Sequence, residues 1–415
     1  MALDTKCREL ENEAAAPGNG GVSNRDLQLL HMPVGESEPS HILNCDGYSV
    51  ACYENAVPPF VESELERLYG NIFSSLSEIT VCRGVNIGNI STCMVREGGE
   101  LVSMLLFLRE KTRVQVLNEG ARISGVELQR FADFIFSTYA SVKVISLHAV
   151  TAETGGMRLP MQRFNCLEDI VLTLPDTAEE YRASLGKATR NYLGRYQNKL
   201  KRSFPSYRHV VYTGEEVQEK HVRDIIQLNR ARMAEKGRVS NKDEEEVQRV
   251  LQLARSHGLV SVLEIDGRVC AGTINYQAGS NYFLDVISHD SEYNDYRLGT
   301  LCCYFTICEC IARGGREYHF LWGQNDYKYR LGGIERGLDH LAIYRSRKHM
   351  VLSCDVVLRN LARRHERQFR LWLQAPERRD NPVLRLAIDL ARGLRQRKLQ
   401  AVQPEAELQA KAANS

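Results

Sequence analysis

The side chains best suited to chemistry lie close together, in residues 296–332. His319 stands near the end of an aromatic, alternating run (317–322), and the polar segment after the break at Gly323 contains Tyr327 and Lys328. An imidazole can take a proton near neutral pH, and a phenol can give one. An ammonium can bind a carboxylate or a phosphate. This combination is typical of a group-transfer site that uses a base and an acid.

A second feature comes just before these residues. The polar turn 296–300 contains a glycine and precedes the apolar run 301–311, which is too long for a strand and ends at Gly314 and Gly315. This pattern predicts a helix. A glycine turn at a helix N-terminus leaves backbone N–H groups free beside the positive end of the helix dipole, which favours phosphate. We expect a phosphate site at Arg297, Leu298, Gly299, Thr300 and Leu301.

The order loop, helix, strand, glycine break and polar helix resembles the C-terminal half of GNAT-type acyltransferases. More narrowly, it resembles the CelD/BcsL-like branch of these enzymes, named for cellulose and exopolysaccharide biosynthesis. The resemblance covers about residues 175–347, and the matching positions are Gly299, Leu301, Gly323, Tyr327, Lys328 and Gly332. It implies an acyl-CoA donor, no metal, and direct transfer to an amine or, second, a hydroxyl of a small molecule, glycan or peptide.

The resemblance and the positions together nominate site residues. Tyr327 and Lys328 stand where the branch has its Tyr-Lys pair, so Tyr327 is expected to be the general acid or a substrate contact. Lys328, Trp322 and Arg190 are expected to bind substrate. His319 replaces an acidic residue common in the branch and is the expected base, with a core histidine as the alternative. Asp285, on a predicted strand, is the next candidate base.

The pattern of apolar residues predicts an α+β fold. An Asp-Gly hairpin and a second turn join three predicted strands, 260–265, 269–277 and 282–288. With helices at 217–234 and 241–256 before them and a strand at 340–345 after them, this order predicts a GNAT-like domain over residues 175–350. Its mixed sheet is expected to be flanked by helices. Residues 41–174 predict a smaller α+β lobe, GNAT-like or degenerate, with helices at 61–76 and 126–139.

A basic segment, residues 186–209, opens the second domain. It has seven lysines and arginines and no acid, and four aromatic side chains are interleaved with them. One interpretation is a cationic arm for an anionic substrate or the phosphates of a nucleotide cofactor. The alternative, slightly favoured, is a solvated helix that packs through its apolar stripe. No recognised nucleic-acid module accompanies it, and we expect no DNA partner.

The C-terminal region is also basic. Residues 345–400 carry fifteen lysines and arginines against five acids, and predict helices at 355–373 and 382–398 within a basic tail, 351–400. Such helices suit peripheral attachment to an anionic membrane or a protein partner. The alternative, which we expect for the first helix, is packing on the protein's own core with a solvated arginine face. Residues 1–40 and 401–415 are expected to be disordered.

Composition limits the class of protein to which the chain can belong. The 415 residues are 43% hydrophobic with a net charge of +2, and no membrane-spanning run or secretory signal is visible. Twelve irregularly spaced cysteines favour reduced thiols and a cytoplasmic location. A peripheral position at the inner face of the membrane is compatible with this location. The cysteines at 302, 303, 308 and 310 do not converge as metal ligands. Signatures of P-loop phosphotransfer and serine hydrolysis are absent from the sequence.

Two other functions stay open. A Fem-type transferase shares the two-lobed architecture but takes an aminoacyl group from charged tRNA, which the basic segment 186–209 would then hold. A non-catalytic scaffold with a degenerate acyltransferase fold is the other, because position 319 lacks the acid common in the branch.

Overall fold

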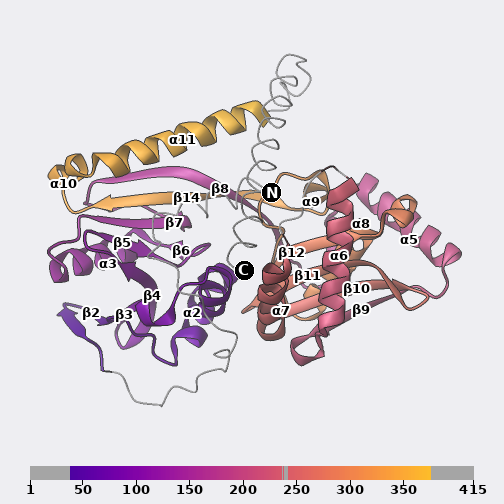
Figure 1. The fold of residues 1–415 in the computed structure, drawn as a ribbon, viewed down its shortest axis with the longest axis horizontal. Helices are drawn as coiled ribbons and strands as arrows, with labels where there is room; N and C mark the ends of the chain where they lie inside the picture. Colours follow the sequence, from indigo (N-terminus) through magenta and orange to yellow (C-terminus); the bar gives the residue numbers. More distant parts are fainter. Residues whose placement is uncertain (1–37, 236, 238–241, 375–415) are drawn as a thin grey trace, which may run out of the picture. The chain divides into compact units, whose positions relative to one another are not determined.

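The computed structural model describes residues 38–235, 237 and 242–374 (Figure 1). Most of the expected N-terminal arm, the second tail helix at 382–398 and residues 401–415 lie outside the described residues. Within them, the chain forms two compact units. The first extends to Ser353, and the second begins at Cys354.

One 14-stranded mixed sheet runs through the first unit, in the order β1-β2-β3-β4-β5-β7-β14-β8-β13-β12-β11-β10-β9, with the short β6 paired to β7. Most neighbours are antiparallel. The parallel pairs are β5–β7, β6–β7 and β12–β13. The strands are β1 (His41–Cys45), β2 (Tyr48–Tyr53), β3 (Ser91–Glu97), β4 (Glu100–Arg109), β5 (Arg113–Val116), β6 (Arg122–Ile123), β7 (Val144–Ala152), β8 (Met161–Thr173), β9 (Arg208–Thr213), β10 (Gly258–Ile265), β11 (Arg268–Ala278), β12 (Asn281–His289), β13 (Glu317–His319) and β14 (Ile334–Tyr344).

Helices flank this sheet, and together they confirm the expected fold class (Figure 1). The α-helices are α2 (Val61–Tyr69), α3 (Gly125–Thr138), α4 (Ala178–Ser184), α5 (Lys187–Ser203), α6 (Glu219–Glu235), α7 (Glu244–His257), α8 (Leu298–Ala312), α9 (Asp326–Arg330), α10 (Arg347–Leu352) and, in the second unit, α11 (Cys354–Gln374). Shorter helical turns are η1 (Ile72–Ser74), η2 (Glu78–Cys82, a π-helix), η3 (Ile87–Asn89), η4 (Gly214–Glu216) and η5 (Ser291–Tyr296).

Alternation along β12 explains how the sheet in residues 175–350, which we call the second lobe, is buried on both faces. Tyr282 and Leu284 pack in the core cluster that contains α8, whereas Phe283 and Val286 pack in the cluster that contains α6 and α7. The strand therefore has apolar residues at most of its positions, as is typical of a strand that is covered on both faces. A Cβ at Gly272 of β11 would lie 2.4 Å from Ile225, so α6 rests directly on the backbone of the sheet.

Several element predictions are confirmed, and three are wrong in extent. The strand meander, α6, α7 and α8 occur where expected. The helix expected at 61–76 ends at Tyr69, because Gly70 takes the left-handed conformation (φ 50°) and caps it. The strand expected at 317–322 keeps only its first three residues, and β14 begins six residues earlier than expected.

The first lobe contributes side chains to the core of the second. Phe73, on η1, lies with its ring centroid 6.0 Å from that of Phe283 and 5.5 Å from that of Trp322. The half-buried Arg83 holds this segment in place. Its guanidinium donates to the carbonyl of Phe73 and forms ion pairs with Glu78 at 2.8 Å and Glu119 at 3.2 Å. Arg83 therefore fixes the position of an aromatic ring that belongs to the other lobe's core.

Replacing Arg83 with Met should lower the free energy of unfolding by about 3–5 kcal/mol, because Glu78 would be left as a buried carboxylate without its cation. Urea denaturation measures this. Arg67→Met is the matched control, since the ion pair of Arg67 with Glu64 is largely exposed and should matter by about 1 kcal/mol or less. Equal, small losses for both variants would mean that Arg83 is not the anchor.

Candidate functional site

The central feature of the site is a pair of parallel strands that separate. β12 and β13 are paired over only three positions, the last of which joins Phe283 to His319. β12 then continues to His289, while the chain after β13 stays with β8 through hydrogen bonds between Ile170 and both Phe320 and Leu321. The strands thus form a V. The edge of β12 beyond Phe283 has no pairing with β13, so its backbone polar groups are available to an extended ligand.

Lys328 holds the second arm of this V. Its side chain is buried, and Nζ donates to the carbonyls of Phe320, Leu321 and Trp322 at 2.7, 3.0 and 2.6 Å. Leu321 has a φ of 58°, an uncommon conformation for a leucine that marks the turn away from the sheet. An ammonium has three N–H donors, and all three are used here. Burial lowers the pKa of Lys328 to about 8.

On the other arm, Asp285 occupies a bulge of β12. Leu284 pairs with Asn275 and Val286 with Ile274, so Asp285 has no residue opposite it on β11. Its carboxylate accepts a hydrogen bond from the Tyr276 hydroxyl at 3.1 Å and lies 3.4 Å from the ammonium of Lys242. Bulges re-aim side chains next to functional sites, and this one places a carboxylate beside the V.

α8 begins shortly after β12 ends. Arg297 caps the helix in the left-handed conformation (φ 55°), and the first helical hydrogen bonds run from Thr300 and Leu301 to its carbonyl. The N–H groups of Leu298 and Gly299 precede those bonds, at the positive end of the helix dipole. A Cβ at Gly299 would lie 2.8 Å from the His289 ring, so the backbone is closely approached there.

The basic segment forms α5, and part of it lies beside this helix start. Lys199 donates to the carbonyl of Asp295 at 3.2 Å and lies over the ring of Tyr296. The pKa of Arg297 is raised, chiefly by a hydrogen bond with Tyr196 of α5. One side of α5 is exposed and carries no acid; its members are Lys187, Asn191, Arg195, Asn198 and Arg202. The N-terminus of α8 is therefore set among cations and phenols.

Tyr327 stands at the start of α9. Its ring packs edge-on to Phe320 with centroids 6.3 Å apart, and it lies against the core cluster that contains α8. Burial raises the pKa of Tyr327, so the phenol keeps its proton at neutral pH. Among the described residues, none forms a hydrogen bond with its hydroxyl, which leaves that proton free to donate.

His319, only 6% exposed, is held between two carboxylates. Nδ1 lies 2.6 Å from Asp169 of β8 and Nε2 lies 3.3 Å from Glu317, while the ring stacks on Phe283. Desolvation lowers the pKa of His319, but the two carboxylates outweigh it and the pKa is raised. The imidazole of His319 beside Glu317, aided by Arg336, lowers the pKa of Glu317 to about 2. The two carboxylates therefore favour the charged form of the imidazole.

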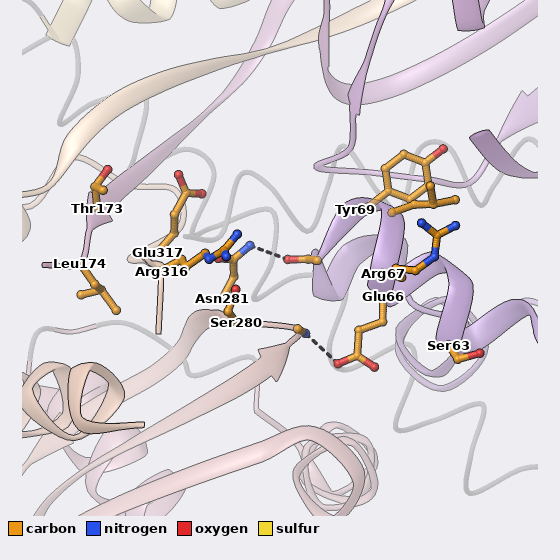
Figure 2. A pocket seen from close by; sticks show the side chains of 13 residues that line it. Ser63, Glu66, Arg67, Tyr69, Thr173, Leu174, Ser280, Asn281, Arg316 and Glu317 are labelled. Carbon is orange, nitrogen blue, oxygen red and sulfur yellow. Dashed lines mark hydrogen bonds between the residues drawn. The ribbon is translucent and has the colours of Figure 1, made fainter. Parts of the chain in front are cut away.

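Figure 2 shows a pocket of about 810 Å³ between the lobes, at the start of β12 and β13. It is bounded by hydrogen bonds from Gly279 N to Glu66 and from Asn281 to Gly70 O. It lies at the opposite end of β12 from α8, about 25 Å away by the rise of an extended strand. The pocket is thus separate from the V, although Glu317 lines it and links it to His319.

The expected site residues form several groups in the structure. Residues 297–301 lie together, while His319, Trp322 and Asp285 flank the V. Lys328 has no donor left for an acceptor. Arg190 uses Nη1 to bind the carbonyls of Ala183 and Leu185, at the turn between α4 and α5.

The sequence analysis missed Asp169, Glu317 and Lys242. Glu317, two residues before His319 on the same strand face, had a detectable signal. Asp169, 150 residues earlier, had none. No group of metal-binding side chains occurs among the described residues.

The charge on His319 predicts a pH-dependent stability. Because its folded-state pKa is raised, its stabilising contribution is complete below about pH 6.5 and is lost as pH rises through the folded value. His319→Gln should therefore lower the free energy of unfolding more at pH 6 than at pH 9, as measured by urea titrations at each pH. Arg268→Gln, an exposed ion-pair residue, serves as the control. An equal loss at both pH values would show that the imidazole does not titrate between pH 6 and pH 9 and would contradict the prediction.

Comparison with known proteins places this geometry in context. Residues 187–329 match the family model described as an acetyltransferase (GNAT) domain. The fold is similar to a crystal structure of FemX, with a TM-score of 0.50 and 9% identity over 68% of this chain and 95% of FemX.

Two weaker structural likenesses accompany it. L-PGS from Bacillus licheniformis has a TM-score of 0.42 and 13% identity, over 75% of this chain and 98% of that one. A tandem GNAT protein from the clavulanic acid biosynthesis pathway has a TM-score of 0.36 and 13% identity, over 71% of this chain and 98% of that one. No curated protein matches the sequence. Residues 187–329 of this chain are a GNAT-type acetyltransferase domain.

Proposed function

We propose that the protein is an acyl-CoA-dependent N-acyltransferase that passes the acyl group directly to an amine. The observation that carries the proposal is the V between β12 and β13, with the N-terminus of α8 just beyond the end of β12. The edge of β12 that β13 leaves unpaired suits the amide-rich arm of coenzyme A. The N–H groups at the start of α8 suit its pyrophosphate.

The proposed chemistry needs a proton donor for the departing thiolate. Tyr327 supports this role because its pKa is raised, so it stays protonated, and no described residue takes up its hydroxyl. The amine attacks the thioester carbonyl, the carbon–sulfur bond breaks, and Tyr327 gives its proton to the sulfur. Backbone N–H groups along the free edge of β12 would stabilise the oxyanion.

The amine must also lose a proton, and two groups are candidates for the base. Asp285 is a carboxylate at the bulge beside the V and comes first. His319 comes second, because its raised pKa means that it must be deprotonated before it can act as a base. In our proposal His319 instead positions β13 against β8, through Asp169. Trp322 and Arg190 remain substrate-contact hypotheses. Because its donors are used, we propose that Lys328 positions the strand end.

A second candidate function is aminoacyl transfer from charged tRNA, as expected of a Fem-type enzyme. The acid-free exposed side of α5 favours it, because lysine, arginine and asparagine along one helix side suit a row of phosphates. The likeness to FemX concerns the fold and does not choose between donors. The cellulose or exopolysaccharide setting and the cytoplasmic location also remain proposals. None of the described helices is long and apolar enough to span a membrane.

Coenzyme A binding tests the donor site. In calorimetry, the protein should bind coenzyme A, and Gly299→Val should weaken that binding by about tenfold or more. A side chain there meets His289 and crowds the backbone N–H groups that receive the pyrophosphate. Gly155→Val is the control, because a Cβ at Gly155 has open space around it. Transfer from charged tRNA without any binding of coenzyme A would establish the Fem-type alternative instead.

Three variants test the chemistry. Tyr327→Phe should lower kcat by about 10²-fold with little change in donor affinity, and Asp285→Asn should do likewise. If Asp285 is the base, the pH–rate profile of His319→Gln keeps its wild-type shape. If His319 is the base, the wild-type rate rises with pH through a value above 6.5 and this rise disappears in His319→Gln. If the folded protein consumes no donor, the non-catalytic scaffold is the remaining hypothesis.

A further inference from the structure

A row of apolar side chains is exposed along α11, in the second compact unit. Leu358 is 63% exposed, Phe369 60% and Trp372 44%, and Leu361 and His365 are exposed between them. Their spacing of three, four, four and three residues places all five on one side of the helix. We call these five residues the α11 stripe. It spans about 21 Å of helix.

The stripe changes the interpretation of this helix. Packing on the protein's own core with a solvated arginine face was expected, yet the exposed apolar side chains belong to the stripe. The less exposed side chains lie on a different side of the helix. Asn360 is only 3% exposed there, and the half-buried side chains are Val356, Val357, Arg363, Arg367 and Leu371. The phenyl ring of Phe369 and the indole of Trp372 stack with centroids 5.7 Å apart, so the stripe ends in a flat aromatic surface.

The charges of the helix point to a negative partner. Residues 354–374 contain five arginines against Asp355 and Glu366. Arg359 and Arg364, both exposed, lie on either side of the stripe. Arginines beside a row of leucine and aromatic side chains match the interface between headgroups and acyl chains in an anionic bilayer. There the arginines contact lipid phosphates while the apolar side chains are buried among the acyl chains.

We propose that α11 docks in the plane of an anionic membrane surface, with the α11 stripe among the acyl chains and the flanking arginines on the lipid phosphates. A second copy of this chain is the weaker partner, because pairing along the stripe would place His365 in the seam and bring like-charged arginines near each other. The proposal is independent of the acyl-transfer reaction.

The test is co-sedimentation of the full-length protein with vesicles. Vesicles of phosphatidylcholine with phosphatidylglycerol should bind the protein, and phosphatidylcholine alone should bind it far less. Replacing both Phe369 and Trp372 with Gln should weaken binding by about tenfold or more. Arg359→Gln should weaken it by about fivefold, in a salt-dependent manner. Val126→Gln, which removes an exposed apolar side chain from α3, should change nothing.

Fluorescence gives a second readout that does not depend on pelleting. The chain has two tryptophans, Trp322 and Trp372. In Trp322→Phe protein, anionic vesicles should shift the emission of Trp372 to the blue, and lipids brominated on their acyl chains should quench it. Failure to bind anionic vesicles overturns the proposal. So does a concentration-dependent dimer of the protein alone that the Phe369 and Trp372 substitutions abolish.

Discussion

The structure depends on how the chain leaves the sheet after His319. A strand that separates from its neighbour gives up backbone hydrogen bonds, and buried carbonyls without partners cost free energy. Lys328 meets this requirement by donating to three successive carbonyls, those of residues 320–322. One buried ammonium thus supplies the hydrogen bonds that a neighbouring strand would otherwise donate to these carbonyls. Without such a donor, the V between β12 and β13 would be costly to keep open.

The need to bond these carbonyls gives two neighbouring residues different roles. Tyr327 and Lys328 are consecutive on the five-residue helix α9, so their side chains leave the helix in directions about 100° apart. Lys328 reaches the strand end, whereas the Tyr327 ring packs near Phe320, and no hydrogen bond joins its hydroxyl to any residue that the structure describes. A short sequence motif of Tyr-Lys therefore combines a positioning residue with a candidate acid. Residue type alone suggested substrate binding for the lysine, because its burial cannot be read from the sequence.

How much the sequence could predict follows from the distance between interacting residues. The meander β10–β12 and the helix α8 were predicted, because turn residues and apolar periodicity are local signals. The strand β8 was not, since Met161–Thr173 joins polar to fully buried positions with no single period. The site shows the same limit. Residues 297–301 form one local turn and were predicted together, whereas the pairing of His319 with Asp169 comes from strand order.

β8 also explains why the domain cannot be separated from the first lobe. It precedes the matched region, residues 187–329, yet it lies between β13 and β14 in the sheet. Without it, β13 would be an edge of three residues, and His319 would keep Glu317 alone as a partner. The raised pKa of His319 and the path of the chain through Leu321 both need a strand from outside the matched region. The two lobes therefore share one sheet because the V requires both of them.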